Sequence, residues 1–178
     1  MNRSLLIAAL LLPLAGLAAS VGIRESELSR AEQYVMPVTG FDPRDVLRGH
    51  YIRYRYDWQV SGDPLWCRDG ACRICLAGDA PDGSRVEIRD LPSAPCPKEI
   101  DWQASGLTLY AVPATSGTAD EAGQPARLDV SGIFYLSESD APAMEQQMAE
   151  TPMVMNVLLT SSGRLVNQSL IPSAPPSR

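Results

Sequence analysis

The sequence predicts a mostly β domain of the α+β class: an antiparallel sheet or small barrel-like domain with one or two short helices, preceded by an N-terminal apolar helix. Three observations lead to this prediction. The chain of 178 residues is 45% hydrophobic and 20% charged, which suits one folded domain. Residues 51–58 alternate between apolar and charged side chains, as in a half-buried strand. Strand-like segments also recur between joints rich in proline and glycine.

The N-terminus has the make-up of a secretion signal. Arg3 precedes an uncharged, mostly apolar run over residues 4–23, with small residues near Ala19. A helix of about 20 apolar residues is just long enough to cross the hydrocarbon core of a bilayer, and the positive-inside tendency places Arg3 in the cytoplasm. We therefore expect residues 1–23 to be a signal anchor that contacts the membrane through residues 4–23. A signal peptide cleaved after Ala19 is the alternative.

Composition divides the rest of the chain into three parts. Residues 24–32 are polar and are expected to continue the helix as a stalk. Residues 33–171 are expected to form one domain, and residues 172–178, which are rich in proline and serine, a flexible tail. The domain begins with a predicted short strand over residues 33–39, which ends at Gly40.

The clearest local signal is a strand with two different faces. Apolar side chains alternate with charged ones in the order Ile52, Arg53, Tyr54, Arg55, Tyr56, Asp57 and Trp58. A period of two places the aromatic residues on one side of a strand and the charges on the other. Tyr54 and Tyr56 are therefore expected in the core. Tyr51 lies on the charged side and keeps its hydroxyl for a partner, or alternatively packs against a neighbouring strand.

Further elements follow from periodicity and turn residues. Additional strands are expected at 85–91, 107–112 and 127–136, and a terminal β-hairpin at 154–160 and 165–171. Ser139 or Asp140 is expected to cap the start of a helix. Met144 and Met148 lie four residues apart on that helix and are expected to face the core.

The four cysteines, Cys67, Cys72, Cys75 and Cys96, allow three chemistries. Their spacing is that of a plant-type iron–sulfur ligand loop, and four thiolates can also hold zinc in a tetrahedron. An even number of cysteines in an exported chain favours disulfides instead. Three pairings are possible. We prefer Cys67–Cys72 with Cys75–Cys96, because a Cys72–Cys75 bond would close the small ring of a redox motif.

One stretch of the chain resembles a known motif. Asp42-Pro43-Arg44-Asp45 leads to Gly49-His50-Tyr51 and then to Tyr54 and Tyr56. This stretch is similar to the motif of the GDYXXLXY family of bacterial envelope proteins. Gly49, Tyr51 and Tyr56 match the family motif, whereas His50 stands in place of its aspartate and Tyr54 in place of its leucine.

The resemblance extends to the apolar N-terminal helix, the aromatic strand at 132–136, the helix with Glu145 and the closing hairpin. It implies a single-pass inner-membrane protein with its domain in the periplasm, or a protein released into the periplasm after signal cleavage. The family carries no assigned reaction, so the resemblance implies an architecture and a location only.

Composition and motifs argue against several functions. A net charge of -6 without a basic cluster argues against nucleic-acid binding. The single histidine, His50, excludes a site that needs two imidazoles, and the chain has no nucleophile elbow, phosphate loop or zinc-protease motif. We therefore expect no catalytic residue and no cofactor.

The sequence favours a non-enzymatic binding or accessory module of the cell envelope. Its expected partner is another envelope protein, such as a multi-pass membrane protein. The alternative is a zinc-binding or iron–sulfur electron-transfer protein that uses the four cysteines.

Overall fold

The computed structural model describes residues 3–40, 51–68, 70–114, 126–137 and 139–173. The chain divides into two units, residues 1–31 and residues 32–178.

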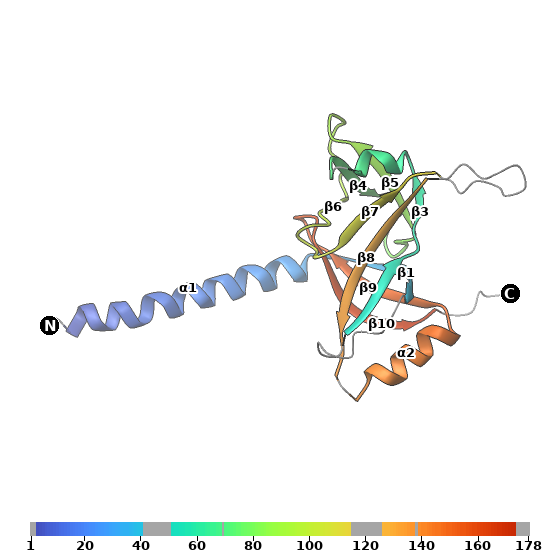
Figure 1. Ribbon diagram of the computed structural model, residues 1–178. Coiled ribbons are helices and arrows are strands. Elements are labelled where there is room, and N and C mark those ends of the chain that lie inside the picture. The colour runs from blue at the N-terminus through green and yellow to red at the C-terminus, as the bar shows by residue number, and fades with distance from the viewer. Residues whose placement is uncertain (1–2, 41–50, 69, 115–125, 138, 174–178) are drawn as a thin grey trace, which may run out of the picture. The chain divides into compact units, whose positions relative to one another are not determined.

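The first unit is helix α1, Arg3–Ser29 (Figure 1). It covers the apolar run and most of the polar segment that follows, and Ser20 Oγ donates to the carbonyl oxygen of Gly16 at 2.8 Å. Among the described residues, no helix combines the length and the apolar character needed to cross a membrane. The expected helix is therefore confirmed, whereas its transmembrane character is not.

The second unit contains a six-stranded antiparallel sheet with the order β10-β9-β1-β2-β8-β7. Its strands are β1 (Glu32–Gly40), β2 (Tyr51–Tyr56), β7 (Thr108–Val112), β8 (Arg127–Tyr135), β9 (Met153–Leu159) and β10 (Leu165–Pro172). These strands are rich in β-branched and aromatic residues, and their inward positions alternate with outward ones, which is the pattern of a half-buried sheet. The strands expected at 33–39, 107–112 and 127–136 and the terminal hairpin are confirmed.

A second, four-stranded sheet has the order β3-β5-β4-β6. Its strands are β3 (Gln59–Ser61), β4 (Cys72–Leu76), β5 (Arg85–Asp90) and β6 (Glu99–Ile100). The sheet is mixed, because β3 pairs with β5 in parallel while β4 pairs antiparallel with β5 and β6. Within the described residues the β structure is therefore two open sheets, and the expectation of a single sheet or a barrel-like closure is corrected.

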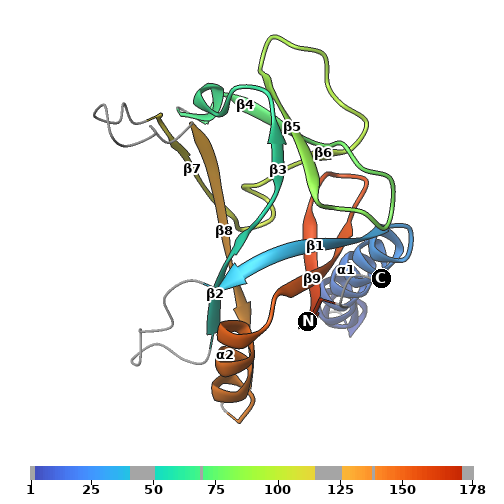
Figure 2. The ribbon, with the colours of Figure 1, turned by 90° about the vertical axis from the view of Figure 1, so that its right-hand side faces the viewer.

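The chain passes directly from one sheet to the other at residues 57–58 (Figure 2). The alternating stretch expected as one strand over residues 51–58 therefore forms β2 as far as Tyr56, and Asp57 and Trp58 connect it to β3. The described part of the unit also contains two short helices, the 3-10 helix η1 (Pro64–Cys67) and α2 (Ala141–Glu150). Asp140 is the N-cap residue of α2 but makes no capping hydrogen bond with its side chain.

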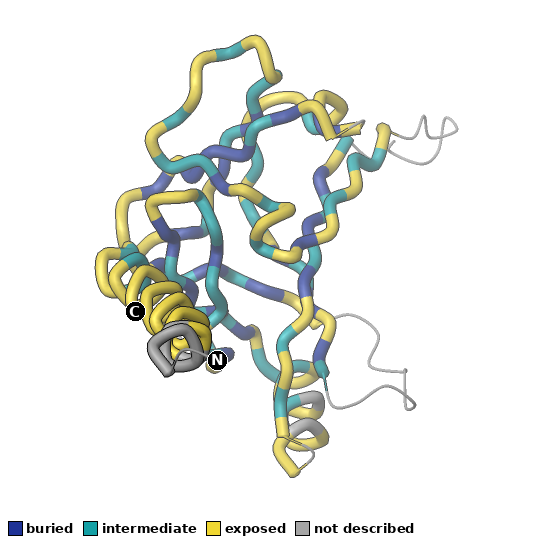
Figure 3. Tube along the Cα trace, turned by 90° about the vertical axis from the view of Figure 1, so that its left-hand side faces the viewer, coloured by how far each residue is buried: buried dark blue, intermediate teal, exposed yellow. Residues whose placement is uncertain are grey.

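One continuous core draws residues from both sheets. Its fully buried large side chains are Tyr34, Met36, Tyr54, Ile74, Val86, Ile88, Ile100, Val130, Met155 and Val157. Buried positions alternate with less buried ones along β1, β2, β8 and β9 (Figure 3). Met144 and Met148 of α2 pack against this core as expected. The core thus fixes which face of the six-stranded sheet points outward.

Candidate functional site

Strand β2 carries the motif tyrosines, and its two faces have different surroundings. Ile52, Tyr54 and Tyr56 are buried, whereas Arg53 on the opposite face is exposed and Arg55 half-buried. The two expected core tyrosines therefore lie in the core. Gly49 and His50, the other motif residues, lie outside the described residues.

The inner face of β2 forms a buried polar network. Asn167 Nδ2 on β10 donates to Tyr54 Oη at 2.8 Å, and the hydroxyl oxygens of Tyr54 and Tyr56 lie 3.5 Å apart. Desolvation raises the pKa of Tyr54 and raises that of Tyr56 well above 10.0. Both hydroxyls therefore stay neutral at physiological pH and serve as hydrogen-bonding groups, which suits a structural role.

Gly132 makes room for this network. It lies directly opposite Tyr54 in the β2–β8 pairing, and a Cβ added at residue 132 would lie 2.4 Å from Tyr54 Oη. The tyrosine ring therefore covers the glycine, and no larger residue fits at position 132 without displacing the ring.

The outer face of β2 and β8 exposes a patch of apolar and cationic side chains. Tyr51 lies opposite Tyr135, and Arg53 lies opposite Ile133. The rings of Tyr51 and Tyr135 meet edge-to-face, with centroids 6.4 Å apart, so Tyr51 packs across the strands as its alternative interpretation expects. Tyr135 is 76% exposed and Ile133 44% exposed. We call Tyr51, Arg53, Ile133 and Tyr135 the outer patch.

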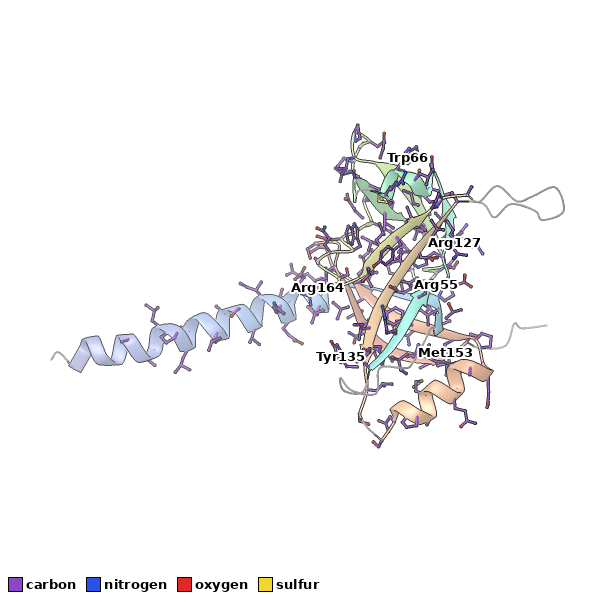
Figure 4. All side chains as sticks on the ribbon, viewed as in Figure 1. Arg55, Trp66, Arg127, Tyr135, Met153 and Arg164 are labelled. Carbon is purple, nitrogen blue, oxygen red and sulfur yellow. A yellow bond between two sulfur atoms is a disulfide. The ribbon has the colours of Figure 1, made fainter. Side chains whose placement is uncertain are left out.

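Sequence reasoning placed Tyr51 at a surface but missed its neighbours on β8. Ile133 and Tyr135 come into contact with β2 only through the antiparallel register between strands about 80 residues apart. Residues 132–136 show no alternation of apolar and polar side chains, so periodicity gives no signal that Ile133 and Tyr135 face outward. Figure 4 shows Tyr135 near one end of the body and Trp66 near the other.

All four cysteines form disulfides, and the pairing is the preferred one. Cys67 is bonded to Cys72, and Cys75 to Cys96. The first bond ties η1 to β4, and the second ties β4 to the segment before β6. Because each sulfur is bonded to another sulfur, the arrangement argues against both an iron–sulfur cluster and a zinc site. Among the described residues, no cluster of three or more His, Cys, Asp or Glu side chains is suited to a metal ion.

The single lysine joins three separate segments. Lys98 Nζ lies 3.1 Å from Asp79 Oδ1, donates to the carbonyl oxygen of Gly78 at 3.2 Å and sits over the ring of Tyr34. Hydrogen bonding with Tyr34 and Asp79 raises the pKa of Lys98. Lys98 is therefore held as a cation that stabilises loops, whereas a catalytic lysine base would need to be neutral.

These features define a class: a disulfide-stabilised, mostly β domain that presents one aromatic and arginine-bearing surface. The chain belongs to the GDYXXLXY family, because the family model described as "GDYXXLXY protein" matches residues 13–170. Neither a curated protein nor a solved structure matches the chain significantly.

Proposed function

We propose that this protein is a non-enzymatic binding module of the bacterial cell envelope that holds a partner protein against the outer patch. The observation that carries the proposal is the exposure of Tyr135 and Ile133 next to Tyr51 and Arg53. Aromatic residues and arginine are enriched where proteins bind one another, and they dominate the binding energy there. The core of the domain does not need these side chains, because they point away from it.

The location proposed for this function is outside the cytoplasm. Two disulfides support it, because disulfides persist in oxidising compartments such as the periplasm. The basic residue and apolar run at the N-terminus have the make-up of an export signal. The proposed partner is another envelope component, for example a multi-pass membrane protein.

The test is photo-crosslinking in living cells with the full chain. A crosslinking amino acid in place of Tyr135 is expected to yield one specific adduct, identified by mass spectrometry. The same amino acid in place of Trp66, which is also exposed but lies on η1, is the matched control and is expected to yield none.

Substitution provides a second arm of the test. Ile133→Ser is expected to remove the adduct formed from position 135 without changing the amount of folded protein. No adduct at position 135, or equal adducts at 135 and 66, would overturn the proposal.

A further inference from the structure

A pocket of about 370 Å³ opens where β2 ends and β8 begins, and no residue of the outer patch lines it. Its lining comes from the end of β2, from β3 and the turn that follows, and from the first residues of β8. Its volume lies in the range of small-ligand sites, which combine an apolar wall with a few polar groups. None of these residues has a role in the proposed partner surface.

Aromatic and aliphatic side chains form one part of the pocket lining. The rings of Tyr56 and Trp58 stack with centroids 4.5 Å apart and an interplanar angle of 5°, and Val60 and Leu128 also line the pocket. Such a wall accepts a flat or branched apolar group. Trp58 Nε1 is buried and has no hydrogen-bond partner among the described residues, so its N–H signal reports directly on any shift of the ring.

The rim of the pocket carries two arginines that share one carboxylate. Arg55 lies 3.8 Å from Asp129, and Arg127 lies 3.4 Å from the other oxygen of the same group. The two arginine side chains are 41% and 54% exposed, and neither has another side-chain partner among the described residues. Each guanidinium therefore keeps N–H donors that can bind a second carboxylate. Figure 4 shows both arginines on the same side of the body.

An acidic residue completes the rim. Asp57 also lines the pocket, and its carboxylate is exposed without a side-chain partner among the described residues. The rim therefore holds two cations and two anions, which disfavours a polyanion such as a polyphosphate. It matches a ligand with one carboxylate for the arginines and one N–H donor for Asp57.

We propose that this pocket binds an apolar amino-acid unit with a free carboxylate. Its apolar side chain packs on the Tyr56–Trp58 wall, its carboxylate binds Arg55 and Arg127, and its nitrogen donates to Asp57. A free amino acid and the C-terminal residue of a peptide share this chemistry. The site is separate from the outer patch, so failure of crosslinking at Tyr135 leaves it standing.

The test is a titration of the full, oxidised chain labelled with ¹⁵N-tryptophan. The chain has three tryptophans, and Trp58→Phe identifies the signal of Trp58. N-acetyl-L-phenylalanine is expected to shift that signal with a Kd of about 1 mM, a typical affinity for a ligand of this size. N-acetyl-L-phenylalaninamide, which lacks the carboxylate, is expected to bind about 10-fold more weakly because it forfeits the charged hydrogen bonds.

Variants and a third ligand complete the experiment. Arg55→Gln and Arg127→Gln are each expected to weaken binding of the carboxylate about 5-fold, whereas Arg85→Gln, on the β5 side of the molecule and paired with Asp82, changes nothing. Tighter binding of free L-phenylalanine identifies a free amino acid as the ligand, and tighter binding of the acetylated form identifies a peptide end. Equal binding of acid and amide, no saturable shift, or an equal loss with Arg85→Gln would overturn the proposal.

Discussion

At the scale of single residues, neighbouring positions of β2, the strand that carries the motif tyrosines, face opposite sides of the sheet. Tyr54 and Tyr56 point inward and form a neutral hydrogen-bonded network with Asn167, whereas Tyr51 and Arg53 point outward. The inner residues pack between β2 and β8, and the outer residues belong to the outer patch. A substitution on one face therefore has a different consequence from one on the other.

Gly132→Ala is expected to destabilise the fold by about 1–3 kcal/mol, because the new methyl group overlaps the ring of Tyr54. Urea unfolding followed by tryptophan fluorescence measures the free energy of unfolding. In a Tyr54→Leu background the same substitution is expected to cost less, since the smaller side chain leaves space beside residue 132. Equal costs in the two backgrounds would contradict the packing argument.

The buried tyrosines predict a loss of stability at high pH. Burial raises the pKa of Tyr54 and Tyr56 above the unfolded value of 10.0, so the folded protein retains protons that the unfolded chain releases. The contribution of these groups is complete below about pH 10 and is lost progressively above it. The urea midpoint, measured from about pH 8 to pH 11, is expected to fall more steeply in the parent than in Tyr56→Phe. Tyr110 is exposed, so Tyr110→Phe is the control. Its urea midpoint is expected to fall as steeply as that of the parent.

At the scale of elements, the six-stranded sheet was largely predictable, whereas in the four-stranded sheet only β5 was, as the strand expected at 85–91. The strands of the first alternate between buried and exposed positions, which periodicity detects. In β4, by contrast, Ile74, Cys75 and Leu76 are all buried, so no alternation exists, and β6 has only two residues. The four cysteines nevertheless predicted that two disulfides cross-link this region.

The contacts within the outer patch and at the pocket rim could not be predicted from the sequence either. Arg55 and Tyr51 were visible as outward residues of a strand, but their partners Asp129 and Tyr135 lie on β8. Which residues of two distant strands meet depends on register, and the pattern within each strand does not specify the register between them.

The two disulfides are expected to contribute unequally to stability. Cys75–Cys96 spans 21 residues and Cys67–Cys72 spans 5, and the entropy lost by the unfolded chain increases with loop length. In the chain-entropy model, Cys75→Ala with Cys96→Ala costs about 3 kcal/mol, and Cys67→Ala with Cys72→Ala about 2 kcal/mol. Urea unfolding of both double variants measures the difference. The reverse order would show that native packing around the shorter loop outweighs the entropy of closure.

At the scale of the whole molecule, export and oxidation are expected to depend on the N-terminal segment. The full chain expressed in bacteria is expected in the membrane or periplasmic fraction with all four cysteines protected from alkylation. A variant without residues 4–23 is expected in the cytosol with alkylated thiols. The intact mass of the exported protein decides whether the segment is retained or removed after Ala19. Disulfides in the cytosolic variant would contradict the expectation that the disulfides form only after export.

The order of strands in the six-stranded sheet also affects how the chain folds during synthesis. β1 pairs with β9 from Glu32 opposite Leu159 to Val38 opposite Met153. Strands β2 to β8 lie between these two partners in the chain, so β9 is made well after β1, and such distant pairing makes folding slow. A chain caught midway through synthesis or translocation therefore leaves β1 with an unpaired edge, open to proteases and to other chains. Synthesis of the β9–β10 hairpin ends this exposure, because β9 then covers the edge of β1.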